Sequence, residues 1–130
     1  MDVASAQALV DGTEFGRWWG FRVEDVGDGV ATVRLPFRQH HLRPGGRLQG
    51  GCAMALADVA FWIACTTRVG DPETTFTLEM KTNFLRPGAT DLLTTARVLR
   101  AGRRVVFGDA QTVDEAGELV AHHTLTYMRA

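Results

Sequence analysis

Residues 48–67 read LQGGCAMALADVAFWIACTT, a run between Arg47 and Arg68 in which Asp58 is the only charged residue. Apolar residues occupy nearly every side of a helical projection, which is typical of a helix that is buried all round. We therefore predict a core helix from about residue 51 to 66. Small side chains along it would let a sheet wrap closely against it; these are Ala53, Ala55, Ala57, Ala60 and Ala64.

The same run is long enough to be a candidate membrane-spanning helix, since about 20 apolar residues cross a bilayer. Three features oppose that interpretation: the pair Gly50-Gly51 near its start, alanine in place of leucine or isoleucine, and a carboxylate at its middle. An acidic group at the bilayer centre is costly. We therefore expect the core helix of a globular domain and no contact with a membrane.

The residues before this run predict three further features. Residues 3–15 have a loose helical period and predict one helix. Residues 21–26 and 30–35 show strand-like alternation on either side of Gly27-Asp28-Gly29, which predicts a β-hairpin. Residues 37–47 hold turn formers without a clear period, so we expect an irregular loop.

Four strand-like runs follow the helix, at residues 75–84, 92–99, 104–113 and 119–128, and turn residues separate them. Long strands joined by short turns predict an antiparallel meander. A sheet on one side of a single buried helix has to curl round the helix to cover it. We therefore expect an α+β architecture in one domain that spans residues 1–130.

The composition narrows the class of protein. The chain has 130 residues, of which 45% are hydrophobic and 22% charged, and its formal net charge is -1. A domain built to bind nucleic acid or an anionic membrane carries a basic excess, which is absent here.

Cys52 and Cys65 would lie roughly 20 Å apart along one helix, whereas a disulfide needs Cα atoms within about 7 Å. Free thiols, and an N-terminus without a secretory signal pattern, predict a cytoplasmic location.

Asp58 is the most informative single residue, because a carboxylate within an apolar helix is costly to bury unless it is paired. Two roles stay open: a catalytic acid or base in a cleft, or a structural acid satisfied by an arginine or by backbone donors. Gly50 and Gly51 lie at the start of the same helix, where unpaired N–H groups can hold a developing oxyanion. Alternatively, these glycines only turn the chain into the helix.

Histidines and cysteines give weaker signals. The pairs His40-His41 and His122-His123 are sequence neighbours, and neighbours in a strand point to opposite faces, so we expect no metal site. Cys52 lies in the first turn of the helix, where a thiolate is favoured. A small core residue is the interpretation that we favour for Cys52.

The stretch Gly46–Ala60, GRLQGGCAMALADVA, resembles the signature of the hotdog-fold acyl-CoA thioesterases, and most closely that of the phenylacetate-pathway (PaaI-like) type. In that signature a glycine pair follows a histidine, and an acid lies nine residues after the histidine, which is the spacing from Gln49 to Asp58. Further similarities follow at residues 83–87 (NFLRP), at Gly102-Arg103 and in the last strand, so the resemblance covers the chain from about residue 20 to its end.

The resemblance implies a hotdog fold and hydrolysis of an acyl-CoA or arylacyl-CoA thioester to the free acid and CoA, without a cofactor. Asp58 would be the general base or nucleophile, and the Gly50 N–H would polarise the thioester carbonyl. Thr77 would help to position water. Members of the family form homodimers and often homotetramers, so we expect a homo-oligomer. The substrate would be bordered by Gly51, Arg43, Arg86, Gly102 and Arg103. Arg86 is equally compatible with a surface turn residue.

Two positions depart from the family pattern. Gln49 stands where the family has its histidine, and Arg43 stands where it has an asparagine. Glutamine can donate and accept hydrogen bonds, but it does not titrate near neutral pH. Gln49 is thus a candidate catalytic residue of altered chemistry. A non-catalytic acyl-CoA-binding module is the alternative to an enzyme, and a purely structural oligomerisation domain, which would leave Asp58 without a purpose, is a third hypothesis.

Overall fold

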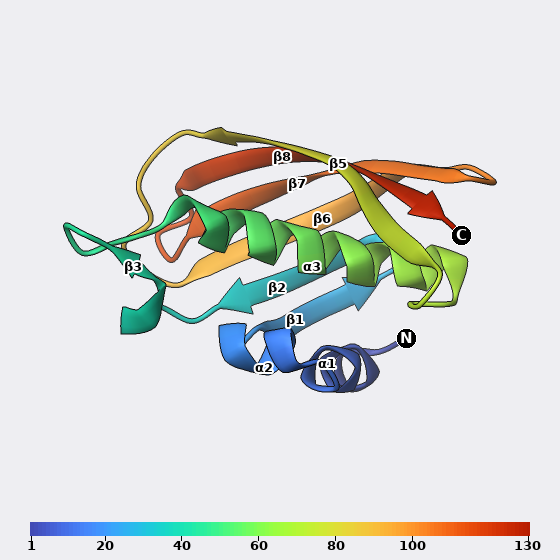
Figure 1. Ribbon diagram of the computed structural model, residues 1–130, viewed down its shortest axis with the longest axis horizontal. Coiled ribbons are helices and arrows are strands. Elements are labelled where there is room, and N and C mark those ends of the chain that lie inside the picture. Colours follow the sequence, from blue (N-terminus) through green and yellow to red (C-terminus); the bar gives the residue numbers. More distant parts are fainter.

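Helix α3 (Gly50–Val69) lies along one face of a curved, six-stranded antiparallel sheet in the computed structural model, which describes residues 1–130 (Figure 1). The strands follow the order β1-β2-β6-β7-β8-β5 across the sheet. This arrangement confirms the expected α+β architecture, with a sheet wrapped around one long helix. The strands are β1 (Arg22–Gly27), β2 (Val30–Leu35), β5 (Thr75–Phe84), β6 (Leu92–Ala101), β7 (Val105–Asp114) and β8 (Leu119–Arg129).

Local signals set both ends of α3. At the N-terminus Gln49 is the N-cap, and its side-chain oxygen accepts a hydrogen bond from the Gly51 N–H at 2.7 Å. At the C-terminus Gly70 adopts a φ of 89°, a left-handed conformation that glycine tolerates without strain, and its N–H donates to the Thr66 carbonyl. The helix therefore extends beyond both ends of the predicted range 51–66.

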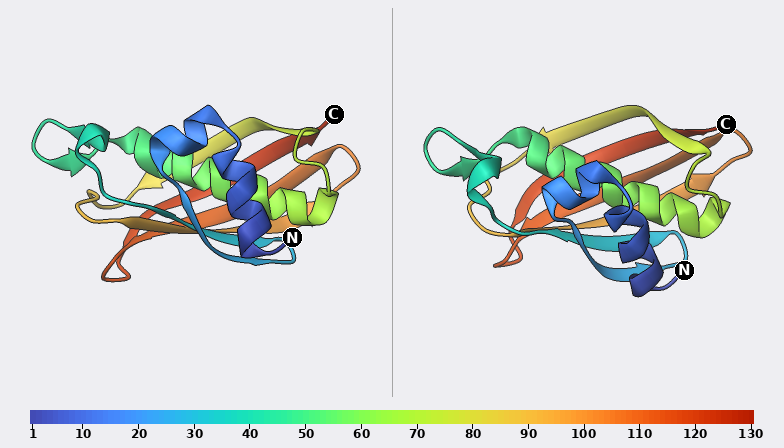
Figure 2. Two further views of the ribbon diagram at one scale, coloured as in Figure 1. Left: turned by 90° about the horizontal axis from the view of Figure 1, so that it is seen from below. Right: turned by 60° about the horizontal axis from the view of Figure 1, so that its bottom comes forward.

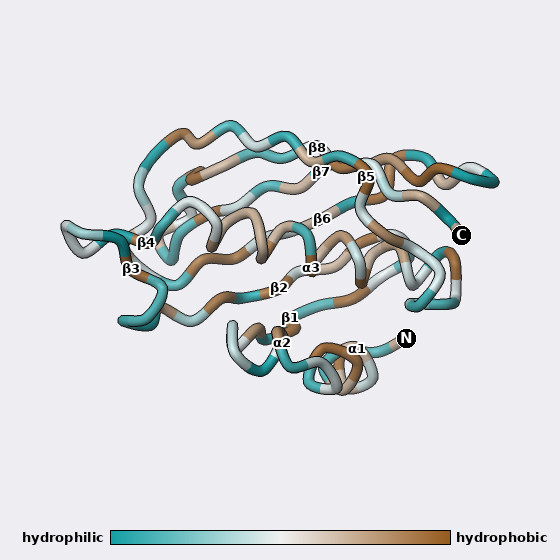
Figure 3. Tube along the Cα trace, viewed as in Figure 1, coloured by the Kyte–Doolittle hydropathy of each residue, from teal (hydrophilic) through white to brown (hydrophobic).

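The sheet-facing side of α3 forms the centre of the core, and α3 is apolar or near neutral along most of its length (Figure 3). Leu56, Phe61 and Ile63 have no exposed surface, and burying such a side chain contributes roughly 1.5–3 kcal/mol. Phe61 packs directly on β7, because a Cβ at Gly108 would come within 2.3 Å of the Phe61 ring. Glycine at position 108 thus lets the helix approach the sheet closely.

One stripe of α3 is only partly buried, so the prediction of a helix buried all round is wrong. Gly51, Ala55, Asp58 and Trp62 are all half-buried. Residues three or four apart share one face of a helix, and these four form a continuous stripe. The physical reason is that one curved sheet covers only one side of α3, and no second layer of this chain fully covers the stripe.

The N-terminal residues form two helices, α1 (Val3–Asp11) and α2 (Glu14–Trp19), where the periodicity predicts one. Thr13 begins the second helix, because its side-chain oxygen accepts from the Gly16 N–H at 3.0 Å. Both helices lie beside α3 on the same side of the sheet (Figure 2). Residues 37–47, expected to be irregular, contain a short 3-10 helix and a small hairpin; these are η1 (Gln39–His41), β3 (Leu42–Arg43) and β4 (Arg47–Leu48).

The strand predictions are confirmed to within two residues at each end. The edge strand β5 pairs with β8 alone, so its other edge has no partner in this chain. Three apolar side chains of β5 are about half exposed, namely Phe76, Leu78 and Phe84. A long, exposed apolar edge is a template for pairing with another strand.

Helix α3 meets the length and composition of a membrane span, yet 61% of its apolar window is buried inside the fold. The sheet supplies most of that cover, through contacts with β2, β6 and β7. A helix covered in this way is the core helix of a globular domain, which agrees with the prediction from the sequence.

A chain of buried polar side chains crosses the sheet below α3. His123 is fully buried on β8, and its Nδ1 and Nε2 atoms each lie 2.8 Å from a threonine hydroxyl, those of Thr82 and Thr112. Thr112 in turn lies 2.6 Å from the hydroxyl of Thr94 on β6. The network joins four strands, and burial lowers the pKa of His123 from 6.5 to about 4.

We expect this histidine to make folding stability depend on pH. The folded pKa lies below the unfolded value, so the contribution of His123 is fully present above about pH 6.5 and falls as pH drops towards 4. The loss at pH 4.5 relative to pH 7.5 amounts to about 2–3 kcal/mol. Urea unfolding of His123→Gln at both pH values should show a smaller pH dependence than the parent. His122→Gln, a change at the neighbouring strand position, should keep the parent's dependence, and equal dependence in all three proteins would contradict the account.

Candidate active site

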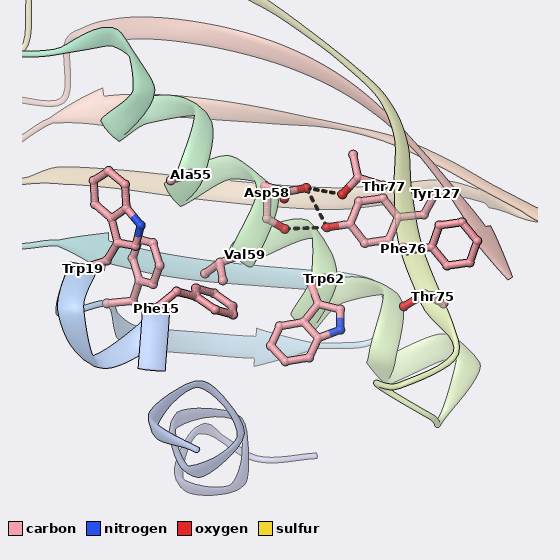
Figure 4. Close-up of a pocket in the computed structure, with 11 residues that line it drawn as sticks. Phe15, Trp19, Ala55, Asp58, Val59, Trp62, Thr75, Phe76, Thr77 and Tyr127 are labelled. Carbon is pink, nitrogen blue, oxygen red and sulfur yellow. Dashed lines mark hydrogen bonds between the residues drawn. The ribbon is translucent and has the colours of Figure 1, made fainter. Parts of the chain in front are cut away.

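The Asp58 side chain lies on the partly buried stripe of α3, where it meets β5 and β8 (Figure 4). Its Oδ1 atom accepts a hydrogen bond from the Thr77 hydroxyl at 2.8 Å. The Tyr127 hydroxyl lies 2.8 Å from both Asp58 Oδ1 and the Asp58 carbonyl oxygen, so its single proton is directed at this residue. Two hydroxyl groups from two strands therefore fix the orientation of the carboxylate.

Tyr127 is itself held rigidly. It is 2% exposed, and its ring makes an edge-to-face contact with Phe61 at 4.9 Å between centroids. Burial raises the pKa of Tyr127, and the nearby Asp58 carboxylate raises it further. The phenol therefore stays neutral at physiological pH and remains a hydrogen-bond donor to Asp58.

The second carboxylate oxygen, Oδ2, has no protein hydrogen-bond partner, and Asp58 borders a cavity of about 270 Å³. The walls of this cavity are mainly aromatic and come from α2, α3, β5 and the segment before β1. They include Phe15, Trp19, Phe21, Trp62 and Phe76. We call this space the Asp58 cavity. An oriented carboxylate with one free oxygen beside an apolar space is equipped to act as a base or a nucleophile.

The N-terminal end of α3 forms a second site. The Gly50 N–H opens the helix and has no hydrogen-bond partner in the chain, while the Gly51 N–H is taken by the Gln49 side chain. A Cβ at Gly51 would lie 2.9 Å from the Gln49 amide, so any larger residue there would shift this side chain from its present capping position. Gln49 and Gly50 line a cavity of about 380 Å³ together with Phe84 and Arg86. We call this space the Gly50 cavity.

The two sites are separate within one chain. Gly50 and Asp58 line different cavities, and eight residues of helix place them roughly 12 Å apart along the axis. One thioester carbonyl cannot reach the Gly50 N–H and the Asp58 carboxylate of the same chain. The candidate residues therefore fall into two groups, Asp58 with Thr77, and Gln49 with Gly50 and Arg86.

The remaining candidates, and Arg86 of the second group, lie away from the Asp58 carboxylate. Arg43 is exposed on β3 and lines neither cavity. Gly102 and Arg103 form the turn between β6 and β7, where they line a shallow hollow with Arg100 and Arg104. Arg86 is exposed and forms a salt bridge with Glu118 at 3.4 Å. The fold thus places these residues on the surface, away from the Asp58 carboxylate.

The cysteines and histidines lie outside the candidate site. Burial raises the pKa of Cys52 to about 11 and that of Cys65 to about 12, so both are neutral thiols at physiological pH. They are free and buried. His40 and His41 pack with Trp18 and Trp19 near η1. No group of three or more His, Cys, Asp or Glu side chains could hold a metal ion.

Sequence reasoning missed the contribution of Tyr127 and of the aromatic cavity walls. The alternation of the last strand does place Tyr127 on its buried face, and a buried tyrosine hydroxyl usually requires a partner. That signal could have pointed to a polar group in the core, of which Asp58 is the obvious example. The aromatic residues of the N-terminal helices carry no comparable local signal.

The long helix wrapped by a curved antiparallel sheet is the hotdog fold, which this chain shares with a solved protein of the thioesterase superfamily. The chain belongs to the thioesterase superfamily, because the model of that family matches residues 45–121, more than half of its length. This membership supports thioester hydrolysis as the general type of reaction.

Individual relatives agree with this assignment. A protein named "Putative esterase" from Saccharolobus solfataricus is 34% identical over 101 residues, which cover 77% of this chain and 71% of that protein. A second one, from Halobacterium salinarum, is 29% identical over 126 residues, covering 93% of this chain and 83% of that protein. Among solved structures, a mutant of the phenylacetic acid degradation protein PaaI from Thermus thermophilus is 32% identical, with a TM-score of 0.81 over 91% of this chain and 100% of that one.

Proposed function

We propose that this protein hydrolyses an acyl-CoA or arylacyl-CoA thioester to the free acid and CoA. The observation that carries the proposal is the Asp58 carboxylate, which is oriented by two hydroxyl donors and has one free oxygen beside an apolar cavity. The apolar cavity suits an acyl group, and the carboxylate suits attack on, or activation of water at, the carbonyl carbon next to it.

The reaction needs three events at the thioester. The Gly50 N–H donates a hydrogen bond to the carbonyl oxygen and stabilises the negative charge that develops there. Asp58 then removes a proton from a water molecule that attacks the carbonyl carbon, or it attacks that carbon itself and the resulting anhydride is cleaved by water. In the first route the C–S bond breaks after water has added, and in the second it breaks as the anhydride forms. In both routes a proton from water ends on the CoA sulfur.

We further propose that each site is shared between two subunits. Gly50 and Asp58 of one chain are too far apart, so the two groups act together only if each comes from a different copy. A two-fold dimer formed through the free edge of β5 would place two copies of α3 side by side in opposite directions. The exposed apolar residues of β5, namely Phe76, Leu78 and Phe84, support this edge as the interface. The dimers would pair further into a tetramer.

Exposed arginines near the Gly50 cavity and on the β6–β7 turn offer contacts for the CoA phosphates. Arg86 lies beside Gly50, and Arg43 lies on the neighbouring hairpin. Arg103 and Gly102 lie on the β6–β7 turn, and Arg103 forms no salt bridge there. Guanidinium groups bind phosphate well, so these residues are our candidates for holding the nucleotide end of the substrate. No cofactor is required, and we place the enzyme in the cytoplasm, where free thiols stay reduced.

One observation favours a non-catalytic acyl-CoA-binding module as the second candidate. The Gln49 side-chain oxygen is engaged in capping its own helix, and glutamine cannot titrate as a histidine would. Thiol release from a panel of acyl- and arylacyl-CoA thioesters distinguishes the two functions. Turnover of at least one thioester supports the enzyme, whereas tight binding without release of CoA from any of them supports the module.

The role of Gln49 leads to a separate prediction. Its Nε2 atom is free to donate to a ligand while Oε1 caps α3, so Gln49→His should preserve or raise activity. Gln49→Ala should lower kcat/KM by about tenfold, the loss expected for one hydrogen bond of about 1.4 kcal/mol. The measurement is steady-state hydrolysis together with thermal unfolding, because the lost cap also destabilises the helix. Parent-like hydrolysis of every thioester by Gln49→Ala would exclude Gln49 from the site.

A further inference from the structure

Trp62 lies one turn after Asp58 on the same stripe of α3, and its indole ring projects from the helix towards α1 (Figure 4). The indole N–H donates a hydrogen bond to the Pro72 carbonyl at 2.8 Å. This bond ties the ring to the turn that precedes β5. Trp62 therefore occupies a fixed position at the end of the Asp58 cavity.

A second hollow lies on the other side of this ring. It has a volume of about 350 Å³ and is lined by Ala8, Leu9, Gly12, Thr13, Pro72 and Glu73, as well as by Trp62. Trp62 is the only residue that lines both this hollow and the Asp58 cavity. The indole is thus the one side chain that the two spaces share, and we call it the partition between them.

We propose that Trp62 sets the maximum length of the acyl group and restricts the enzyme to short or compact acyl chains. The proposal rests on the proposed thioester hydrolysis. Four residues of helix separate Asp58 from Trp62, or about 6 Å along the axis, so an acyl chain pointing this way meets the indole within a few carbons of its carbonyl. Without the ring, the Asp58 cavity would open into the hollow beneath α1 and the chain could continue there.

The test compares kcat/KM for butyryl-, hexanoyl-, octanoyl-, dodecanoyl- and palmitoyl-CoA in the parent, Trp62→Phe and Trp62→Ala. We expect the parent to lose activity beyond octanoyl-CoA. Each additional buried methylene is worth roughly a fourfold gain, so Trp62→Ala should raise the ratio of dodecanoyl to hexanoyl turnover by at least about tenfold. Trp62→Phe keeps a ring at the partition and should change the ratio by less than about threefold.

A second variant examines the hollow itself. Ala8 is an exposed residue of α1 that lines it, so Trp62→Ala combined with Ala8→Phe should block the new space and restore the parent's length preference. Thermal unfolding identifies any variant that fails to fold, and Trp62→Leu then replaces Trp62→Ala with a smaller expected shift.

The outcomes separate this inference from the proposed function. The same length series is also measured as binding to an Asp58→Asn protein with and without Trp62→Ala, which requires no turnover. If the parent hydrolyses thioesters and the folded Trp62 variants keep its length preference, the role of Trp62 is wrong and the proposed function stands. Absence of both turnover and acyl-CoA binding in the parent would overturn the proposed function and, with it, the partition.

Discussion

Replacing Asp58 by asparagine is expected to lower kcat/KM at least about a hundredfold, the low end for removing a positioned acid–base group. The amide has nearly the same shape as the carboxylate, and its oxygen can still accept from Thr77 and Tyr127, the partners that hold Asp58 Oδ1. It cannot take a proton from water or form an acyl anhydride. The fold and the affinity for CoA should therefore persist while turnover disappears.

A matched control lies on the opposite face of the sheet. Asp109 is also a half-buried carboxylate, 3.3 Å from His122 Nε2, and it lies outside both cavities. Asp109→Asn makes the same chemical change and should keep parent-like turnover. Activity is measured as thiol release from the best substrate of the panel, with circular dichroism and thermal unfolding of each variant. A folded Asp58→Asn protein with near-normal hydrolysis would refute the mechanism.

Replacing Gly50 by proline should cost roughly a hundred- to a thousandfold in kcat, the range for loss of one oxyanion donor. Proline has no N–H, yet it fits the first position of a helix, where that N–H has no intrahelical partner. The preceding residue must be extended before a proline, and Gln49 already has φ of -72° and ψ of 153°. The substitution therefore removes the proposed donor while the helix is retained.

Gly50→Ala is the control for side-chain bulk at this position. A Cβ here would lie 3.3 Å from the Phe84 ring, so the ring has to move by only a few tenths of an ångström. Alanine keeps the N–H and should retain most of the parent's turnover. A folded proline variant that keeps most of the parent's turnover, as the alanine variant should, would show that the Gly50 N–H does not take part in the reaction.

Much of the fold could be predicted because each strand carries its own local pattern. The alternation in residues 75–84 and the turns on either side of it depend only on neighbours in the sequence, and β5 has those bounds. The break between α1 and α2 depends on more than the local cap at Thr13. A Cβ at Gly16 would lie 2.2 Å from the Val10 carbonyl, so this tight corner follows from contacts that form only as the two helices fold together.

In the candidate site, too, some residues could be predicted from the sequence and others could not. Asp58 could be selected from the sequence because it is the one charge in a long apolar run. Tyr127 could not be assigned to it, since 69 residues separate the two and the pairing of β8 with β5 and β7 decides where the hydroxyl lies. The partial exposure of the stripe around Asp58 also escaped prediction, because composition does not reveal which side of a helix the sheet will leave uncovered.

Mixing Asp58→Asn chains with Gly50→Pro chains tests the shared site most directly. Each parent dimer has no intact site. A hybrid dimer combines Gly50 of the first chain with Asp58 of the second in one site and carries both defects in the other. Random exchange at equal concentrations makes half of the dimers hybrid, so the mixture should recover about a quarter of the activity of the unmodified protein. Verified hybrids that recover no activity, or a stable monomer with full activity, would contradict a site shared between subunits.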